Sequence, residues 1–152
     1  MVESNPKVIE IKLNKHYRFM YENFVLATQS AVYLLLAKSG DRVDVLKFDR
    51  HTIFRYGAPN DEVRGSHPLS KFGLGFYGLY QVSHSPWVQE IIAANRIHPR
   101  HSDQLFEGLS HFVACFKDVT FEIIAREMRE VSMDFAEFNA LVATQLNYLE
   151  EA

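Results

Sequence analysis

The sequence predicts an α+β domain, made mainly of an antiparallel sheet of about six to seven strands, with one mid-chain helix and one C-terminal helix. Two observations indicate this class. Several short segments alternate apolar and polar residues, which is the period of a half-buried strand. Two longer segments carry apolar residues at helical spacing behind a residue that can cap a helix. With 47% hydrophobic residues among 152, one ordinary core suffices, so we expect residues 1–152 to form a single domain.

The first half of the chain predicts four strands, from alternation or from a continuous apolar run. They are residues 8–13, 17–22, 31–37 and 42–48, and the last strand either ends there or continues to residue 54. Ser39, Gly40 and Asp41 break the chain between the last two strands, as a turn does. We therefore expect these two strands to be partners in the sheet.

The second half predicts a long loop and three further strands. Residues 56–73 are rich in Gly, Pro, Asn and Asp, and a loop of this length in a compact domain is uncommon unless it is functional or disordered. The strands are residues 74–82, 111–116 and 120–125, the last two joined by a short turn. Gly78 leaves a gap in the first of these strands, which is typical of a bulge or of a close backbone approach.

The two helices are indicated by their caps. Ser85 can cap the first helix and Pro86 suits its first position, while Pro99 predicts that it ends two or three residues earlier. Asp134 can cap the second helix, with Glu137 completing a capping box. The second helix also carries apolar residues at helical spacing, which predict a core-facing stripe. This stripe consists of Phe135, Phe138, Val142, Leu146 and Leu149.

Composition and charge exclude several functional classes. No apolar run approaches the roughly 18 residues that a membrane span requires, and residues 1–7 lack the layout of a signal peptide. The single cysteine rules out an internal disulfide, so we expect a soluble, cytosolic protein. Residues 102–152 carry ten Asp and Glu against three Lys and Arg, which argues against nucleic-acid binding. We interpret this acidic segment as a solubilising face, with attachment of a basic partner as the alternative.

Two motifs resemble functional signatures but have structural explanations. Residues 73–78 match G-x-G-x-x-G, yet a polar loop precedes them and strand-like residues follow, whereas a dinucleotide site needs a strand before the glycines and a helix after them. We interpret these glycines as strand-entry or bulge positions. Cys115 and His111 stand four residues apart on one strand, about 13 Å, which is too far for a nucleophile and its base. Cys115 is expected to be a small core residue.

The histidines are the strongest chemical indication in the sequence. Five of the seven lie between residues 51 and 101. His98 and His101 are separated by two residues, so both imidazoles could reach one ion from a loop. His111 or His84 would complete a three-ligand zinc site with an open position for water. No helical pair of histidines fixes this geometry, and surface or hydrogen-bonded histidines are the alternative interpretation.

The loop supplies further candidate groups. Asn60 and Asp61 are natural turn residues, and Glu62 with Arg64 is interpreted as a solvated pair. The alternative is that the loop forms the polar rim of a pocket. The ligand-binding candidates are then Arg55, Asn60, Asp61, Glu62, His67 and His84. Trp87 is interpreted as a core residue, although an exposed aromatic patch would indicate a partner or dimer contact.

Three stretches resemble those of a group of small bacterial proteins of unassigned function. They are YGAPNDE with GSHPL (residues 56–62 and 65–69), W with NRIHP (87 and 95–99), and HF with FKDVTFE (111–112 and 116–122). The resemblance covers about the middle half of the chain. It implies that these segments belong to one structural unit, and it implies no reaction or ligand.

Three functions fit these observations. The first is a non-enzymatic domain, expected as a homodimer, that binds a small molecule or a protein through its polar middle segment. The second is a metal-assisted hydrolase or lyase, with zinc held by His98, His101 and either His111 or His84, and with Asp61 or Glu62 as acid–base. The third is an interaction protein that uses the acidic C-terminal face. The first is favoured because the sequence contains no firm catalytic constellation.

Overall fold

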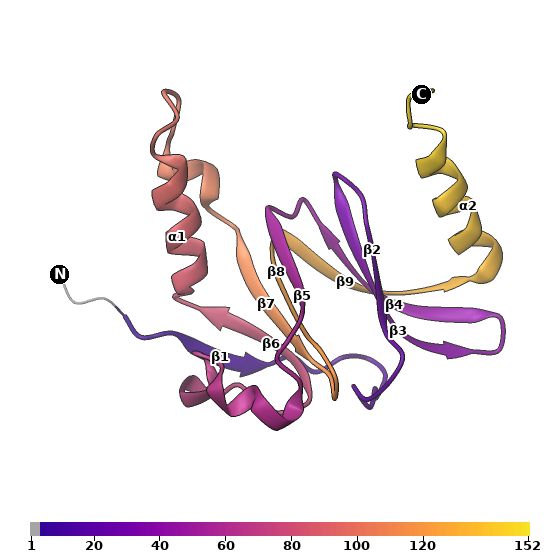
Figure 1. Cartoon of the computed structure of the whole chain (residues 1–152), viewed down its shortest axis with the longest axis horizontal. Coiled ribbons are helices and arrows are strands. Elements are labelled where there is room, and N and C mark those ends of the chain that lie inside the picture. The colour runs from indigo at the N-terminus through magenta and orange to yellow at the C-terminus, as the bar shows by residue number, and fades with distance from the viewer. Residues whose placement is uncertain (1–3) are drawn as a thin grey trace.

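Nine strands form two antiparallel sheets in the computed structural model, which describes residues 4–152 (Figure 1). The five-stranded sheet has the order β1-β6-β7-β8-β5, and the four-stranded sheet has the order β2-β3-β4-β9. The first comprises β1 (Lys7–Glu10), β6 (Gly78–Ser83), β7 (Ser110–Cys115), β8 (Thr120–Ala125) and β5 (Ile53–Gly57). The second comprises β2 (Phe24–Ala27), β3 (Ala31–Ser39), β4 (Arg42–Asp49) and β9 (Glu127–Asp134).

The two helices are α1 (Pro86–Asn95) and α2 (Phe135–Leu146). Ser85 caps α1 by accepting a hydrogen bond from the Val88 amide, and Asp134 caps α2 by accepting one from the Glu137 amide. The α+β class is therefore confirmed, with one mid-chain and one C-terminal helix, but the number of strands exceeds the six to seven predicted. No helix within residues 4–152 is both long and apolar enough to cross a membrane.

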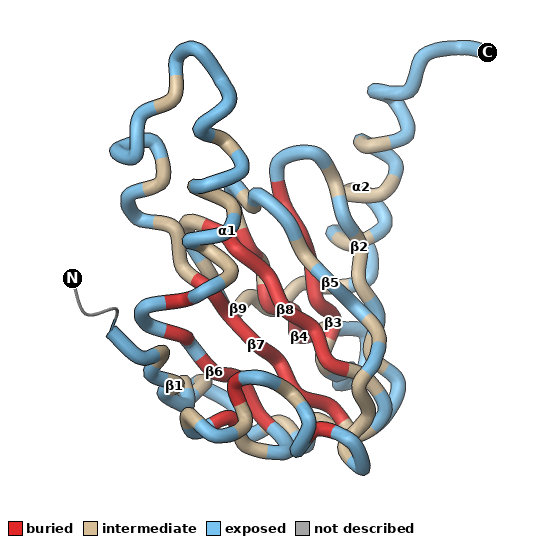
Figure 2. The backbone as a smooth tube through the Cα atoms, turned by 60° about the vertical axis from the view of Figure 1, so that its left-hand side comes forward, coloured by how far each residue is buried: buried red, intermediate tan, exposed pale blue. Residues whose placement is uncertain are grey.

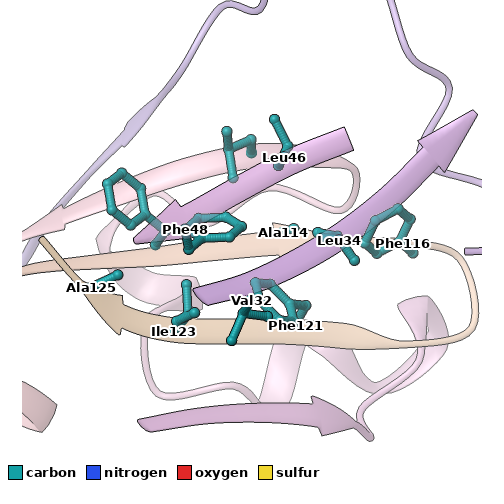
Figure 3. Close-up of a cluster of buried hydrophobic side chains, with 11 residues drawn as sticks. Val32, Leu34, Leu46, Phe48, Ala114, Phe116, Phe121, Ile123 and Ala125 are labelled. Carbon is teal, nitrogen blue, oxygen red and sulfur yellow. The ribbon is translucent and has the colours of Figure 1, made fainter. Parts of the chain in front are cut away.

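One face of each sheet packs against the other to form the main core. Figure 3 shows side chains of β3 and β4, such as Val32 and Phe48, beside side chains of β8, such as Phe121. The ring centroids of Phe48 and Phe121 lie 5.4 Å apart. Only Arg126 separates β8 from β9, so the chain passes directly from one sheet into the other. This packing buries the inner face of β8, as Figure 2 shows for the central strands.

The outer face of the five-stranded sheet is also covered, because all six residues of β8 are buried. The cover includes the predicted loop, which contains two 3-10 helices, η1 (Asp61–Ser66) and η2 (Ser70–Phe72). Leu69, between them, packs into a second core cluster with Tyr80, Val113 and Cys115. A third 3-10 helix, η3 (Asp103–Phe106), follows α1. The loop is thus a structural layer over the sheet, and polar side chains lie beneath it.

The predicted core-facing stripe on α2 is wrong in its second half. No residue of α2 is buried, and Leu146 and Leu149 are 60% and 70% exposed. Only Phe138 and Leu141 pack against the third core cluster, on the outer face of the four-stranded sheet. Figure 1 shows why: α2 rises away from the sheet after β9, so its later turns extend beyond the strands.

Residues 17–22 do not form the predicted strand. Phe19 and Glu22 have φ values of 55° and 47°, in the left-handed region, which no strand residue adopts. The Phe19 ring instead packs on Phe116, with centroids 5.2 Å apart, and the Tyr17 hydroxyl donates to Glu130 at 2.9 Å. The alternating aromatics therefore anchor a connection between the two sheets rather than an extended strand.

Other boundaries also differ from the expectation. The continuation of β4 to residue 54 is wrong, because Arg50 has a φ of 51° and the next strand, β5, joins the other sheet. The first strand ends at Glu10, and β6 begins at Gly78 rather than at residue 74. Strands β2 and β9 were not predicted. Each lies at an edge of the four-stranded sheet and contains no fully buried residue, so neither shows a regular apolar alternation.

Candidate functional site

A carboxylate lies in the middle of the best-buried strand. Glu122 of β8 is 7% exposed and projects from the outer face of the five-stranded sheet, toward the loop and α1. Arg55 of β5 and Val113 of β7 are its direct cross-strand partners. Directly opposed residues point to the same face of a sheet. Arg55 and Glu122 therefore belong to one polar patch, although no ion pair joins them among residues 4–152.

Two histidines hold the Glu122 carboxylate. The Nε2 atoms of His67 and His111 lie 3.0 Å from Oε2 and Oε1 of Glu122, respectively. His67 comes from the segment between η1 and η2, and His111 from β7. The Ser85 hydroxyl lies 2.7 Å from Nδ1 of His111 and also accepts a hydrogen bond from the Val88 amide, as the cap of α1. The network therefore joins the loop, two strands and the start of the helix.

The hydrogen bonds define which nitrogens carry protons. An ionised carboxylate only accepts hydrogen bonds, so both Nε2 atoms donate to Glu122. The Leu69 amide donates to Nδ1 of His67 at 3.0 Å, so this nitrogen carries no proton and the imidazole is neutral. The fourth bond, between the Ser85 hydroxyl and Nδ1 of His111, runs in either direction according to the tautomer of His111. In both cases Glu122 accepts from the two Nε2–H groups.

The network keeps Glu122 ionised. Burial by itself raises the pKa of this carboxyl, but hydrogen bonds from His111 and His67, together with the electrostatic attraction of both imidazoles, outweigh the effect and lower the pKa to about 2. At neutral pH the group is therefore a carboxylate in a site from which most water is excluded. A carboxylate with so low a pKa is a weak base and a good hydrogen-bond acceptor.

These side chains line a cavity of about 350 Å³. Its polar lining consists of Arg55, His67, Glu90, His111, Thr120 and Glu122, and apolar side chains from the loop and α1 complete the wall. The Arg55 guanidinium stacks over the Trp87 ring, 3.9 Å from its centroid. The Trp87 ring in turn meets the His111 ring edge to face at 5.3 Å. Trp87 thus connects the cation at the rim to the network beneath it.

Two larger hollows lack this convergence. One, of about 700 Å³, lies between residues 10–20 and 77–79, and its charged side chains are exposed. The other, of about 780 Å³, lies between α2 and the turn from β2 to β3 and has no charged side chain among its described lining residues. Buried polar groups therefore single out the smallest of the three hollows as the candidate site.

Arg64 fixes the loop above the cavity. Its guanidinium is 1% exposed and donates to the carbonyl oxygens of Phe116, at 2.5 Å, and Val119, at 3.0 Å, with a further bond to the carbonyl of Phe76. Thr120 donates from its hydroxyl to the carbonyl of Pro59 at 2.7 Å. The expected solvated pair of Glu62 and Arg64 is therefore wrong. The guanidinium is tolerated in the interior because its Nη1 and Nη2 groups donate to five backbone and hydroxyl oxygens, although its buried Nε has no partner among residues 4–152.

The other loop candidates lie outside the cavity. Asn60 caps η1 by accepting from the Val63 amide at 3.3 Å, and Asp61 accepts from the Tyr77 hydroxyl at 2.5 Å. Glu62 and His84 are exposed. Of the six ligand-binding candidates, the structure thus brings together Arg55 and His67. Turn chemistry accounts for Asn60, which was the other interpretation of these residues.

The proposed zinc ligands do not converge. His101 binds Asp103 through Nε2 at 2.5 Å and faces Asn95 through Nδ1, while the exposed His98 accepts from the Arg100 amide. His111 lies in β7 and is engaged by Glu122 instead. Within residues 4–152, no group of three His, Cys, Asp or Glu side chains is placed to hold a metal ion. The turn after α1 carries its histidines away from the sheet, so it does not meet the loop at the cavity.

The sequence did not identify Glu122, Trp87 or Ser85 as members of a site. Ser85 was expected only as a helix cap, and Trp87 as a core residue or as part of an aromatic partner contact. Glu122 stands within an apolar predicted strand, and a carboxylate in such a strand is rarely buried without a partner. The position of Glu122 within an apolar strand was the one local indication of this site.

The two functional-looking motifs have structural roles. A Cβ at Gly75 would collide with the Tyr80 hydroxyl, and Gly73 and Gly78 have φ values of 111° and 119°. The glycines thus shape the approach to β6. Cys115 is fully buried, and burial raises the pKa of its thiol to about 12. It is a core residue, as predicted.

Comparisons with known proteins add no family. No protein-family model matches the chain, and neither a curated protein nor a solved structure matches it. The resemblance to small bacterial proteins therefore stays a prediction. Two of the three resembling stretches contain His67 and Glu122, which bind one another.

Proposed function

We propose that the protein is a binding domain that holds a small organic molecule in the cavity formed by β5, β8, the loop and α1. The observation that carries the proposal is the buried Glu122 carboxylate, held by two imidazoles on the wall of a 350 Å³ cavity. Cavities for small ligands are of this size, with an apolar wall and a few fixed polar groups. The hydrogen-bond network makes Glu122 a fixed acceptor, which suits recognition.

Binding fits this network better than catalysis does. Each ring nitrogen of His67 and His111 is hydrogen-bonded to a protein group, and His111 lies between Ser85 and Glu122 as the histidine of a serine–histidine–carboxylate triad does, but the other members are poorly suited to that chemistry. The low pKa of Glu122 makes it a poor general base at neutral pH. Ser85 is 5% exposed and occupied as a helix cap, which disfavours it as a nucleophile. A metal-assisted reaction is not proposed, because the histidines expected to hold the ion are apart.

The intrinsic fluorescence of Trp87 tests the proposal. Trp87 is the one tryptophan of the chain and lines the cavity, so an occupant changes its emission. We expect a panel of small charged and aromatic fragments to yield ligands that shift this emission. Ala58→Phe fills the exposed rim and should abolish binding of these ligands. Ala58→Ser, at the same position, is the matched control and should retain binding. A panel without any saturable ligand would exclude the proposal.

A second candidate function is self-association through α2, with a second copy of this chain as the partner. Leu146, Tyr148 and Leu149 expose apolar side chains beside the 780 Å³ groove. A two-fold axis would place the ridge of one copy in the groove of the other. Light scattering should then give twice the chain mass of 17.6 kDa, and Leu146→Ser with Leu149→Ser should halve it. A single-chain mass for the unaltered protein would remove this candidate.

A cytosolic location is also proposed. It is supported by the free, buried Cys115, the one cysteine of the chain, which needs no oxidising compartment. Fractionation of cells that express the protein tests it, and recovery outside the cytosolic fraction would contradict it.

A further inference from the structure

We infer that the cavity selects a small zwitterion, a molecule with an ammonium group for Glu122 and a carboxylate for Arg55, as in a free amino acid. The inference rests on the proposed binding function and adds the class of ligand. It follows from two oppositely charged residues, Glu122 and Arg55, that are cross-strand neighbours and line the same cavity.

The Glu122 carboxylate has capacity left for a cation. Each carboxylate oxygen offers two acceptor sites, and each receives one hydrogen bond from an imidazole. No Lys or Arg side chain pairs with Glu122 among residues 4–152, so the two imidazoles are its partners there. An incoming ammonium would donate to the free acceptor sites and bring a full positive charge beside the carboxylate. Glu122 therefore favours a cationic donor over a neutral one.

Arg55 offers the opposite charge to the same ligand. It forms no ion pair with any carboxylate in residues 4–152. Its guanidinium carbon lies over the Trp87 ring, 3.9 Å from the centroid, and a guanidinium in contact with an aromatic face can still donate N–H groups to an anion. A guanidinium in this setting matches the two oxygens of a carboxylate. The contact with Trp87 thus leaves the Arg55 guanidinium available to bind an anionic group of a ligand.

The sheet places the two charged residues at one cavity, where a compact zwitterion could meet both. Glu122 and Arg55 are direct cross-strand partners, so their Cα atoms are about 5 Å apart and their side chains leave the sheet on one face. Pro59, Pro68 and Leu69 form an apolar part of the wall, which suits a short hydrocarbon side chain. Glu90 also lines the rim and, like Arg55, it is exposed. The ammonium is expected at Glu122 because water screens a buried charge less than an exposed one.

The first experiment compares ligands on the unaltered protein. A pool of the twenty free L-amino acids is screened by ligand-observed NMR, and each binder is measured by calorimetry. The best binder is then compared with its N-acetyl derivative, which lacks the ammonium, and with its amide, which lacks the carboxylate. We expect each derivative to lose about tenfold or more in affinity, which is the usual effect of removing a charged hydrogen bond. If no amino acid binds, or if either derivative binds equally well, the inference is overturned.

The second experiment assigns the charges to residues. Arg55→Gln should cut affinity for the amino acid about tenfold or more but leave affinity for its amide unchanged. Glu122→Gln should cut affinity for the amino acid about tenfold or more but leave affinity for its N-acetyl derivative unchanged. Glu62→Gln removes an exposed charge from the loop outside the cavity and is the matched control, for which we expect unchanged affinity. A loss in Glu62→Gln with none in Arg55→Gln overturns the inference.

The two proposals fail in different ways. If only fragments other than zwitterions bind, and Ala58→Phe abolishes their binding, the binding function stands while the zwitterion inference is wrong. If Ala58→Phe abolishes the binding of no ligand, the binding function and the zwitterion inference are both wrong. The comparison of the amino acid with its two derivatives uses the unaltered protein, so it tests the zwitterion inference even if a variant does not fold.

Discussion

The carboxylate of Glu122 accepts a hydrogen bond from His67 across 55 positions of sequence, with 3.0 Å between the two atoms. The side chains of both residues are more than nine-tenths buried. This bond ties the segment that carries η1 and η2 to the central strand β8, and His111 completes it from β7. The order of the loop over the cavity therefore depends on the ionised state of one carboxyl group.

The first prediction concerns Glu122→Gln. The amide keeps the shape of the side chain but turns one acceptor into a donor that faces an imidazole N–H. Because the pKa of Glu122 is about 2 in the folded chain against an ordinary 4.5, ionisation stabilises the fold by roughly 3 kcal/mol at neutral pH. We expect Glu122→Gln to lose about this much free energy of unfolding at pH 7, measured by urea denaturation.

The same variant has a defined pH dependence. A lowered carboxyl pKa stabilises the fold above pH 4.5, and this stabilisation disappears as the pH falls toward 2. The difference between the unaltered protein and Glu122→Gln should therefore shrink between pH 5 and pH 2. Glu127→Gln removes an exposed carboxylate from β9 and serves as the control, with a change below about 1 kcal/mol. If the difference in free energy of unfolding between the unaltered protein and Glu122→Gln stays constant from pH 5 to pH 2, the lowered pKa of Glu122 is refuted.

The second prediction concerns Arg64. Its side chain satisfies carbonyl oxygens of three separate segments, so Arg64→Ala leaves several buried acceptors without donors. We expect a loss of roughly 3 to 5 kcal/mol in the free energy of unfolding. Arg64→Lys should recover only part of it, because an ammonium lacks the planar fork of donors. Arg42→Ala, an exposed arginine of β4, is the control and should cost under about 1 kcal/mol. Equal stability of the Arg64→Ala and control variants would contradict the role.

The third prediction concerns the contact between Gly75 and Tyr80. A methyl group at Gly75 collides with the Tyr80 hydroxyl, which donates to the Tyr77 carbonyl at 2.7 Å. We expect Gly75→Ala to cost about 1 to 3 kcal/mol. In a Tyr80→Phe background the hydroxyl is absent, so the added cost of Gly75→Ala should fall, as a double-mutant cycle measures. Gly65→Ala has open space and should be nearly neutral. Additive effects at 75 and 80 would show that the collision does not occur.

The fourth prediction concerns Cys115. It is fully buried with its pKa raised to about 12, so it is neither accessible nor ionised at pH 8. A disulfide reagent such as dithiobisnitrobenzoate should release no thiolate signal from the folded protein and one equivalent after guanidinium is added. Because Cys115 is the one cysteine, every signal belongs to it. Full modification within seconds and without denaturant would place the thiol at the surface.

Local pattern predicted the parts of the fold that depend on local chemistry. The apolar run at β3, the turn at Gly40 and the cap at Ser85 lie where the sequence indicated. The pattern failed where tertiary contacts override it. Residues 17–22 alternate like a strand, but the Phe19 ring finds a place in the main core that only a left-handed backbone reaches. The edge strand β9 is too weakly patterned to be recognised and forms because β4 offers it a partner along eight residues.

The sequence by itself determined the α+β class, the caps of both helices, the polar loop and the buried character of Cys115, because each follows from residues close together in the chain. It also suggested Arg55 and His67 as site residues. Only the tertiary structure decided that Glu122 is the centre of the site, that His111 serves it rather than a metal, and that His98 and His101 lie apart. Strand pairing joins residues that are 11 to 67 positions apart, and no local pattern carries that register.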